Sequence, residues 1–234
     1  MTALTIVFDL DGTLVDTAPD LIDTLNVVLA REGLPPIDYA RARNLIGGGA
    51  RRMIESGLQF EGRPSPRDAV DRMFGDFIAH YSTHIADRSR PFPGLDDALD
   101  RLTAHDCRFA VCTNKLERLS RRLLDALGLA GRFAAICGQD TFGIQKPDPE
   151  ILRQTIQAAG GVLDRAVMVG DSGTDIATAR AAGIPVVAVG FGYSDPPVAQ
   201  LGPDRLIGHF SELAAAVLEL APAFPSPRQP SQNL

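Results

Sequence analysis

The stretch Thr5–Thr17, TIVFDLDGTLVDT, decides the fold and raises a question of chemistry. Its first four residues are apolar or β-branched, which is typical of a buried strand. Asp9 and Asp11 follow directly, although two like charges at the end of a buried strand repel each other and lose favourable hydration. The pattern therefore predicts that a cationic group binds at this end of the strand.

The composition narrows the class of protein. The chain has 234 residues, of which 45% are hydrophobic, so it can fill the core of one large domain or of a domain with an insertion. A formal net charge of -6 argues against a general binder of nucleic acid or of anionic membranes. This composition favours chemistry on a small molecule, and we expect the chain to be a monomer or a homodimer.

The cysteines and the N-terminus indicate the compartment. Three cysteines without C-x-x-C spacing predict neither a disulfide framework nor a zinc site. The N-terminus runs straight into a strand without the pattern of a signal peptide, and no run approaches the roughly 18 apolar residues of a membrane span. These features predict a cytoplasmic protein that contacts no membrane.

Short apolar runs recur along the chain, with helix-like stretches between the later ones. This alternation predicts an α/β protein with a doubly wound parallel sheet, in which helices cover both faces. The predicted strands are Leu4–Phe8, Phe109–Cys112, Ala134–Cys137, Ala166–Val169 and Val186–Val189.

A long insertion interrupts this alternation. Roughly 90 residues separate Asp16 from Phe109, far more than a βαβ crossover needs. Apolar residues at helical spacing, including Leu21 and Leu25 and later Met73 and Phe77, indicate that the inserted segment is helical. The predicted division is an α/β core of residues 1–16 and 88–221, an inserted helical domain of residues 17–87, and a proline-rich C-terminal tail of residues 222–234.

Polar residues follow four of the predicted strands and loops. In open α/β sheets ligands bind outside the carboxyl ends of the strands, so we expect these residues to gather at one site. They are Asp9 and Asp11; Thr113, Asn114 and Lys115; Lys146, Pro147 and Asp148; and Asp171, Ser172 and Asp175. Each group alone fits a turn, a solvated loop or a helix cap. Together, and in this order, they favour a catalytic site.

The residue types indicate which chemistry the site performs. Asp9, Asp11 and Asp171 offer only oxygen ligands, which suits Mg²⁺ held by carboxylates, waters and a substrate phosphate. A carboxylate attacks an anionic phosphoryl group only when the repulsion is neutralised, and a metal together with Lys146 would do this. Thr113 and nearby amides would hold the phosphoryl oxygens.

The blocks FDLDGTLVDTAPDL, TNK, KPDPEIL and GDSGTD resemble the four motifs of the haloacid dehalogenase-like superfamily, and in particular its phosphoglycolate phosphatase branch. The resemblance extends to about Leu220. It implies a Mg²⁺-dependent phosphatase that hydrolyses a small phosphomonoester, foremost 2-phosphoglycolate, through an aspartyl-phosphate. It also implies that the helical insertion is a cap that closes over the substrate and excludes water.

The resemblance assigns a role to each motif residue. Asp9 would be the nucleophile, and Asp11 would protonate the leaving alcohol and then activate water. Thr113, with Asn114, would bind the phosphoryl group, and Lys146 would neutralise its charge. The Mg²⁺ ligands would be Asp9, the main-chain oxygen of Asp11, and Asp171. Asp175 would orient these ligands without binding the metal itself.

The sequence LIGGGARRM is the candidate for substrate contact within the insertion. Gly47, Gly48 and Gly49 let the backbone approach a ligand, and Arg51 or Arg52 could pair with a substrate carboxylate. The same residues also fit a plain loop and a solvated helix start. Leu116 stands where many members of the branch have proline after Thr-Asn-Lys, which leaves the stiffness of that loop and the substrate less defined.

Other functions fit parts of the pattern. A dehalogenase is disfavoured because Asp11 supplies an acid that dehalogenation does not need, and a phosphonate hydrolase is disfavoured because no lysine lies between Asp16 and Arg108. A β-phosphoglucomutase-like enzyme or a pyrophosphatase stays open, since both use the same acid pair. A non-enzymatic phospho-acceptor module is the distant alternative. The helical insertion and Asp11 both argue against a phosphoryl group that persists on the protein.

Overall fold

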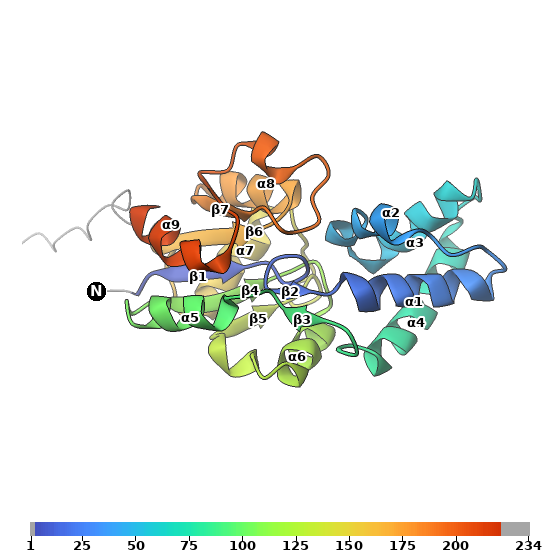
Figure 1. The fold of residues 1–234 in the computed structure, drawn as a ribbon, viewed down its shortest axis with the longest axis horizontal. Coiled ribbons are helices and arrows are strands. Elements are labelled where there is room, and N and C mark those ends of the chain that lie inside the picture. The colour runs from blue at the N-terminus through green and yellow to red at the C-terminus, as the bar shows by residue number, and fades with distance from the viewer. Residues whose placement is uncertain (1–2, 221–234) are drawn as a thin grey trace, which may run out of the picture.

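The computed structural model describes residues 3–220, so the expected tail of residues 222–234 lies outside the described part of the chain. A sheet-based core carries the N-terminus at one end, and a group of helices extends from its other end (Figure 1). Among the described residues no helix combines the length and the apolar character that crossing a membrane would need.

The core is built on a six-stranded sheet in the order β5-β4-β1-β6-β7-β8, with every neighbouring pair parallel. The expectation of a doubly wound parallel α/β fold is therefore confirmed. The strands are β1 (Thr5–Phe8), β4 (Arg108–Cys112), β5 (Ala135–Cys137), β6 (Ala166–Gly170), β7 (Val186–Val189) and β8 (Arg205–Ile207).

Helices cover both faces of this sheet because alternate side chains of each strand point in opposite directions. Ile6 and Phe8 belong to the hydrophobic cluster that includes helices α5 (Leu95–Thr103), α6 (Glu117–Ala126) and α9 (Leu213–Leu220). Val7 belongs to the opposite cluster, with α7 (Pro149–Ala158) and α8 (Gly173–Ala182). The apolar side chains of the central strand β1 are wholly buried between these two layers.

Local sequence signals place the starts of the two helices that follow the site loops. Asp148 caps α7 by accepting a hydrogen bond from the Glu150 amide, and Pro149 begins that helix. Ser172 and Asp175 form a capping box at the start of α8. These caps fix the loops that carry Lys146 and Asp171.

Two features lie outside the strands expected from sequence. The edge strand β8 has only three residues, two of them exposed, so it lacks a strong apolar signal. A two-stranded antiparallel ribbon pairs β2 (Val15–Asp16) with β3 (Arg90–Pro91). Short 3₁₀ turns connect several elements, at Ile46–Gly48, Ala130–Arg132, Leu163–Arg165, Val198–Leu201 and Phe210–Glu212.

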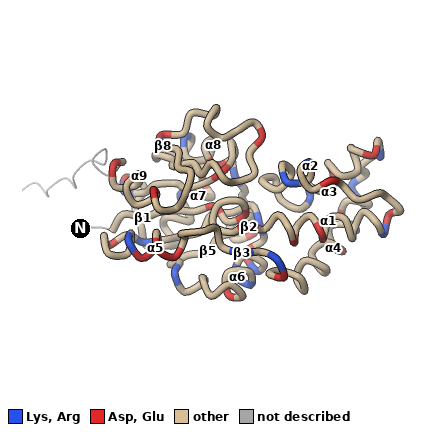
Figure 2. Tube along the Cα trace, in the orientation of Figure 1, with Lys and Arg blue, Asp and Glu red and all other residues tan. Residues whose placement is uncertain are grey.

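The helical part consists of α1 (Ala18–Arg31), α2 (Tyr39–Arg43), α3 (Gly49–Phe60) and α4 (Arg67–Thr83). The apolar stripe of α1 packs against that of α4, and Leu25, Met73 and Phe77 are almost completely buried. Figure 2 shows acidic and basic residues interspersed along both the core and the helical part. The apolar side chains between these helices belong to the same hydrophobic cluster as Ile6 and Phe8 of the core.

The chain enters and leaves the helical part at adjacent positions. The β2–β3 ribbon pairs Asp16 with Arg90. In the first turn of α1, the buried Asp20 carboxylate accepts hydrogen bonds from the backbone amides of Arg88 and Ser89 and from the Ser89 hydroxyl. These contacts hold the two connections side by side, where the helical part meets the carboxyl ends of the central strands (Figure 1).

Candidate active site

The carboxyl ends of three neighbouring strands bring the expected site residues together. Asp9 follows β1, Thr113 follows β4 and Asp171 follows β6, and these strands are adjacent in the sheet. Lys146 comes from the loop before α7. The Asn114 side chain holds this loop, since it donates to the Lys146 carbonyl oxygen (3.2 Å) and accepts from the Lys146 amide (2.9 Å).

Lys146 lies between two carboxylates. Its Nζ is 2.9 Å from Asp9 Oδ1 and 2.6 Å from Asp175 Oδ1, and all three side chains are buried. Burial opposes the charge of Lys146, but the neighbouring Asp175 and Asp9 carboxylates outweigh it and raise the pKa of the ammonium group above its ordinary value. Lys146 is therefore a fixed positive charge beside the expected nucleophile.

Three carboxylates form a cluster that could hold a metal ion. One oxygen from each of Asp9, Asp171 and Asp175 lies within 4.8 Å of the others. Burial, together with the Asp175 and Asp9 charges, raises the pKa of Asp171 to about 8. Burial also raises the pKa of Asp9 to about 6, although Lys146 acts in the opposite direction. Such a site favours binding of a cation, because the cation compensates charges that burial leaves costly.

The hydrogen bonds show which of the three carboxylates could reach a metal. Asp175 uses Oδ1 for Lys146 and Oδ2 for both the amide and the hydroxyl of Ser172, so it has the least acceptor capacity left of the three. Asp9 accepts hydrogen bonds from described residues only at Oδ1. Asp171 accepts from the Thr13 hydroxyl (3.1 Å) and the Tyr193 amide (2.7 Å). Buried all-oxygen donors of this kind fit a hard divalent cation, with Asp9 and Asp171 as carboxylate ligands.

Two glycines leave the room that Asp171 occupies. A Cβ atom at Gly12 would lie 2.5 Å from Asp171 Oδ2, and one at Gly192 would lie 2.2 Å from Asp171 Cβ. Gly12 also has a φ of +85°, which other residues rarely adopt. The glycine of the Asp-Gly-Thr motif thus serves both the turn and the close approach of the Asp171 carboxylate.

Asp11 points to a different partner. Its Oδ1 and Oδ2 lie 2.9 and 3.1 Å from Lys115 Nζ. Burial opposes the charge of Lys115, but Asp11 raises the pKa of this ammonium group above its ordinary value. The ammonium group also lies 4.5 Å from the centre of the Tyr81 ring, in the helical part. The sequence groups Lys115 with the strand-end residues but indicates no role for it. Tyr81 falls in the same apolar helical stripe as Met73 and Phe77, so the sequence does not distinguish it from a core residue.

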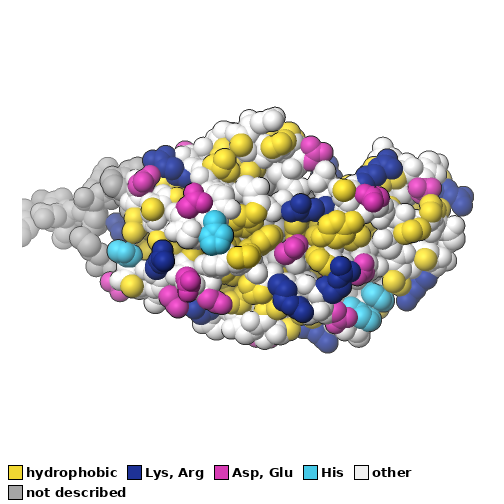
Figure 3. Space-filling model, viewed as in Figure 1, with side chains coloured by type: hydrophobic (Ala, Val, Ile, Leu, Met, Phe, Trp, Pro, Cys, Tyr) yellow, Lys and Arg dark blue, Asp and Glu magenta, His cyan; other side chains and the backbone are white. Residues whose placement is uncertain are grey.

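The glycine-rich stretch of the helical part faces the same strand ends. Gly47 and Gly49 line a small cavity together with Asp9, Asp11 and Thr113. Gly48 and Arg52 line a wider cleft with Ser172 and Thr174 of the core. Figure 3 shows the hollow between the two parts on this face.

The two candidate arginines have different surroundings. The Arg51 guanidinium pairs with Asp71 at 2.5 Å and lies 4.6 Å from the centre of the Phe74 ring. Arg52 packs against Gly48, where a Cβ atom would lie 2.4 Å from Arg52 Cδ. Both arginines also line a cleft with Asn114 and Lys146, and the contacts with α4 hold the Arg51 guanidinium there.

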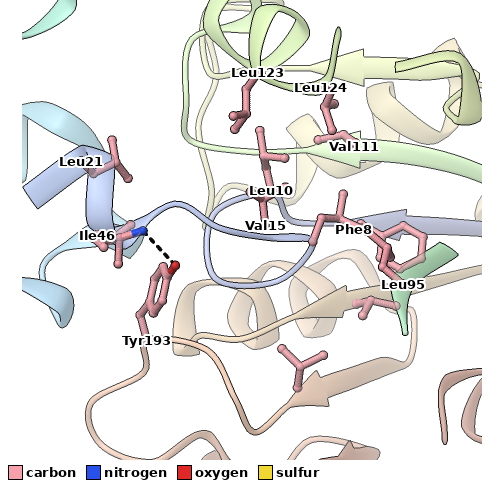
Figure 4. Close-up of a cluster of buried hydrophobic side chains, with 14 of the residues drawn as sticks. Phe8, Leu10, Val15, Leu21, Ile46, Leu95, Val111, Leu123, Leu124 and Tyr193 are labelled. Carbon is pink, nitrogen blue, oxygen red and sulfur yellow. Dashed lines mark hydrogen bonds between the residues drawn. The ribbon is translucent and has the colours of Figure 1, made fainter. Parts of the chain in front are cut away.

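Tyr193 connects the site to the helical part, and sequence reasoning missed it. Figure 4 shows its hydroxyl at the end of a dashed hydrogen bond, which runs to the amide of Ala18 at the start of α1 (3.0 Å). Arg43 of α2 lies 4.9 Å from the centre of the Tyr193 ring and donates to the carbonyl oxygens of Phe191 and Gly192. No local pattern marks this tyrosine, because its partners are far away in the sequence.

A family comparison agrees with the motifs and with the site geometry. The family model of haloacid dehalogenase-like hydrolases matches residues 6–189, a range that includes the site residues from Asp9 to Asp175. The chain belongs to this family. It is an enzyme of the phosphoric monoester hydrolase class.

Individual relatives resemble the chain over nearly its full length. A phosphoglycolate phosphatase of Mesorhizobium japonicum is 50% identical over 214 residues, covering 92% of this chain and 94% of the relative. One of Caulobacter vibrioides is 44% identical over 223 residues, covering 95% and 94%. The crystal structure of a predicted phosphoglycolate phosphatase from Haemophilus somnus 129pt superimposes with a TM-score of 0.84 at 29% identity, covering 92% and 98%. The expected likeness to the phosphoglycolate phosphatase branch is confirmed.

Proposed function

We propose that this hydrolase is a Mg²⁺-dependent phosphatase that converts 2-phosphoglycolate to glycolate and phosphate through an aspartyl-phosphate. One observation carries the proposal. The Asp9 carboxylate is held by Lys146 next to Asp171, while Asp11, two residues further on, lines the same cavity. The phosphoglycolate phosphatases of Mesorhizobium japonicum and Caulobacter vibrioides support the choice of substrate.

In the first half of the reaction, Asp9 attacks the phosphorus atom and forms a P–O bond as the bond to the ester oxygen breaks. Asp11 gives a proton to that departing oxygen, which leaves as the hydroxyl of glycolate. Lys146 balances the negative charge that approaches Asp9, and Thr113 donates to a phosphoryl oxygen. Asn114 keeps Lys146 in place through the two backbone hydrogen bonds described above.

In the second half, Asp11 takes a proton from a water molecule as its oxygen attacks the phosphorus. The bond to Asp9 breaks, phosphate is released and the Asp9 carboxylate is restored. Asp9, Asp171 and the main-chain oxygen of Asp11 would hold Mg²⁺, with Asp175 supporting Lys146 and the start of α8. When bound, Mg²⁺ supplies positive charge that lets the anionic substrate approach a carboxylate.

The helices of residues 17–87 act as a cap over this site. Gly48 allows the backbone to approach the substrate, and Arg52 attracts the anionic ester at the rim of the cleft. Arg51 supports the same wall from its position on Asp71 and Phe74. Closure of the cap excludes water during the first half of the reaction. A cytoplasmic location and a monomeric or homodimeric state stay predictions from the sequence.

Phosphate release from a panel of esters tests the proposal. The panel contains 2-phosphoglycolate, phosphoserine, β-glucose 1-phosphate, pyrophosphate and a nucleoside monophosphate, each with Mg²⁺ and with chelator. We expect 2-phosphoglycolate to give the highest kcat/KM, and Asp9→Asn to be inactive with every ester. Mass spectrometry of the quenched wild type should find a phosphoryl group on Asp9. A higher kcat/KM for pyrophosphate or for the sugar phosphate would contradict the proposed substrate but leave the chemistry in place.

A further inference from the structure

Lys115 is an unusual residue for this chain. Only two lysines occur among its 23 basic residues, and both Lys115 and Lys146 are buried at the active site. Lys146 is bonded to Asp9 and Asp175. Lys115 has three N–H donors, and its only described charged partner is Asp11. Asp11 takes two of these donors and the ammonium group otherwise contacts Tyr81, so the remaining donor can also meet a ligand.

Tyr81 adds a second sign of a ligand at this place. The side chain is 1% exposed, and its hydroxyl makes no hydrogen bond of ordinary geometry to a described residue, with the Lys115 ammonium group as the polar group that interacts with it. A buried hydroxyl without a well-formed hydrogen bond costs free energy, and it is most simply explained by a group that binds there. Tyr81 and Lys115 are in contact through the ring face, although one comes from the helical part and the other from the core.

Two adjoining cavities meet at Lys115. The first is a small cavity that holds the expected nucleophile. The second contains Tyr81 and is otherwise lined mostly by apolar residues. Both are lined by Asp11, Asn114 and Lys115, so a phosphoryl group in the first cavity would direct its leaving group toward the second.

The covalent structure of a 2-hydroxy acid phosphate fits this arrangement. A single carbon separates its ester oxygen from its carboxylate, and the ester oxygen must lie within hydrogen-bond distance of Asp11. The group that binds the carboxylate must therefore lie next to Asp11, as Lys115 does at 2.9 Å. Arg51 and Arg52 line neither of the two cavities.

We infer that Lys115 and Tyr81 form an anion subsite beside Asp11 that binds the carboxylate of the leaving group. The subsite selects phosphate esters of 2-hydroxy acids over neutral esters of the same size. The inference rests on the proposed function, because it concerns the substrate of that reaction. It moves the recognition of the carboxylate from the cap arginines to the core lysine and leaves Arg52 to attract any phosphate ester.

A pair of matched substrates tests the subsite. Carbamoylmethyl phosphate has the shape of 2-phosphoglycolate but a neutral amide in place of the carboxylate. The measured quantity is the ratio of kcat/KM for 2-phosphoglycolate to kcat/KM for the amide, in the wild type and in Lys115→Met, Tyr81→Phe, Arg51→Ala and Arg52→Ala. Binding of glycolate to each protein, measured by calorimetry, gives a readout without turnover.

We expect the wild type to prefer the carboxylate by about tenfold to hundredfold, the range for a hydrogen bond to a charged group. Lys115→Met should remove most of this preference, and Tyr81→Phe should lower it about threefold to tenfold. Both changes should weaken glycolate binding. Arg51→Ala and Arg52→Ala should change kcat/KM for the two esters by the same factor, so that the ratio stays as in the wild type.

Tyr81→Phe removes only a hydroxyl that makes no hydrogen bond of ordinary geometry to a described residue, so this variant keeps the packing of the cap and decides the test if Lys115→Met does not fold. A wild type that cleaves the amide as well as 2-phosphoglycolate would overturn the subsite while the proposed phosphatase stands. Equal losses on both esters in Lys115→Met and Tyr81→Phe would also overturn it. A protein that cleaves neither ester refutes the proposed function and the subsite together.

Discussion

Tyr193 donates a hydrogen bond of 2.5 Å from its hydroxyl to Asp16 Oδ1, although 177 residues separate the two in the sequence. The same hydroxyl accepts from the Ala18 amide, and the Tyr193 amide donates to Asp171. Burial and the Asp16 carboxylate raise the pKa of Tyr193, so the phenol stays protonated and remains a donor. Through its hydroxyl and its backbone amide, this one residue joins the first turn of the cap to a carboxylate of the expected metal site.

Replacing Tyr193 by Phe tests this connection. The change leaves the buried Ala18 amide and the Asp16 carboxylate without a partner, so we expect the free energy of unfolding to fall by about 1–3 kcal/mol. Urea denaturation measures the loss. Tyr39→Phe is the matched control, because Tyr39 is 43% exposed and the same change there should cost less than about 0.5 kcal/mol. Equal stability of the two variants would show that the buried hydroxyl contributes nothing.

Comparing alanine substitutions at Gly12 and Gly128 separates two effects. One is the steric clash of a Cβ atom with Asp171, and the other is the strain of a positive φ. Both glycines have positive φ, +85° and +72°, but a Cβ atom at Gly128 would meet nothing within 4 Å. Gly128→Ala should therefore cost only about 1 kcal/mol of stability. Gly12→Ala should cost more and should also weaken Mg²⁺ binding, because the new methyl group displaces the Asp171 carboxylate. Calorimetric titration with Mg²⁺ measures the second effect, and unchanged affinity in Gly12→Ala would contradict this use of the glycine.

Lys146 is expected to stabilise the fold as well as to act in catalysis. Lys146→Met leaves Asp9 and Asp175 buried without their counter-ion, and breaking such a pair costs about 3–5 kcal/mol. Removing one of the two carboxylates should relieve part of this cost. We therefore expect Lys146→Met with Asp175→Asn to be more stable than the sum of the two single changes predicts. Thermal denaturation of the four proteins measures the coupling, and strict additivity would argue against a stabilising triad.

The sequence predicts the parts of this structure that depend on local patterns. The apolar runs around Val7 and Val167 are short, β-branched and followed by polar residues, so they indicate both the parallel strands and the edge at which the site forms. Asp9, Thr113, Lys146 and Asp171 do come together at that edge. They gather there because all strands of a parallel sheet end on the same side.

The parts that the sequence does not predict depend on contacts between distant segments. Nothing near Tyr193 indicates Asp16 as its partner, and nothing near Arg51 shows that Asp71 holds its guanidinium. Tyr81 has the spacing of an apolar stripe, so its hydroxyl beside Lys115 becomes visible only once the cap meets the core. The groups that surround a substrate are therefore the hardest property to predict from the sequence, because they come from both the cap and the core.

Removal of the metal is expected to destabilise the protein more as pH rises. Burial raises the pKa of Asp9 to about 6 and that of Asp171 to about 8 in the metal-free protein, from an ordinary value of 3.8. A carboxyl group whose pKa is raised by folding contributes stability that is fully present below about pH 4 and is lost as pH rises through the folded pKa. Bound Mg²⁺ compensates the ionised carboxylates and suppresses that loss. The difference in Tm between Mg²⁺-saturated and chelator-treated protein should therefore grow from pH 6 to pH 8.5.

Asp171→Asn removes the group with the higher of these two pKa values, so its Tm difference should be small and nearly independent of pH. A difference that is constant across this range in the wild type would show that these carboxylates do not bind the metal.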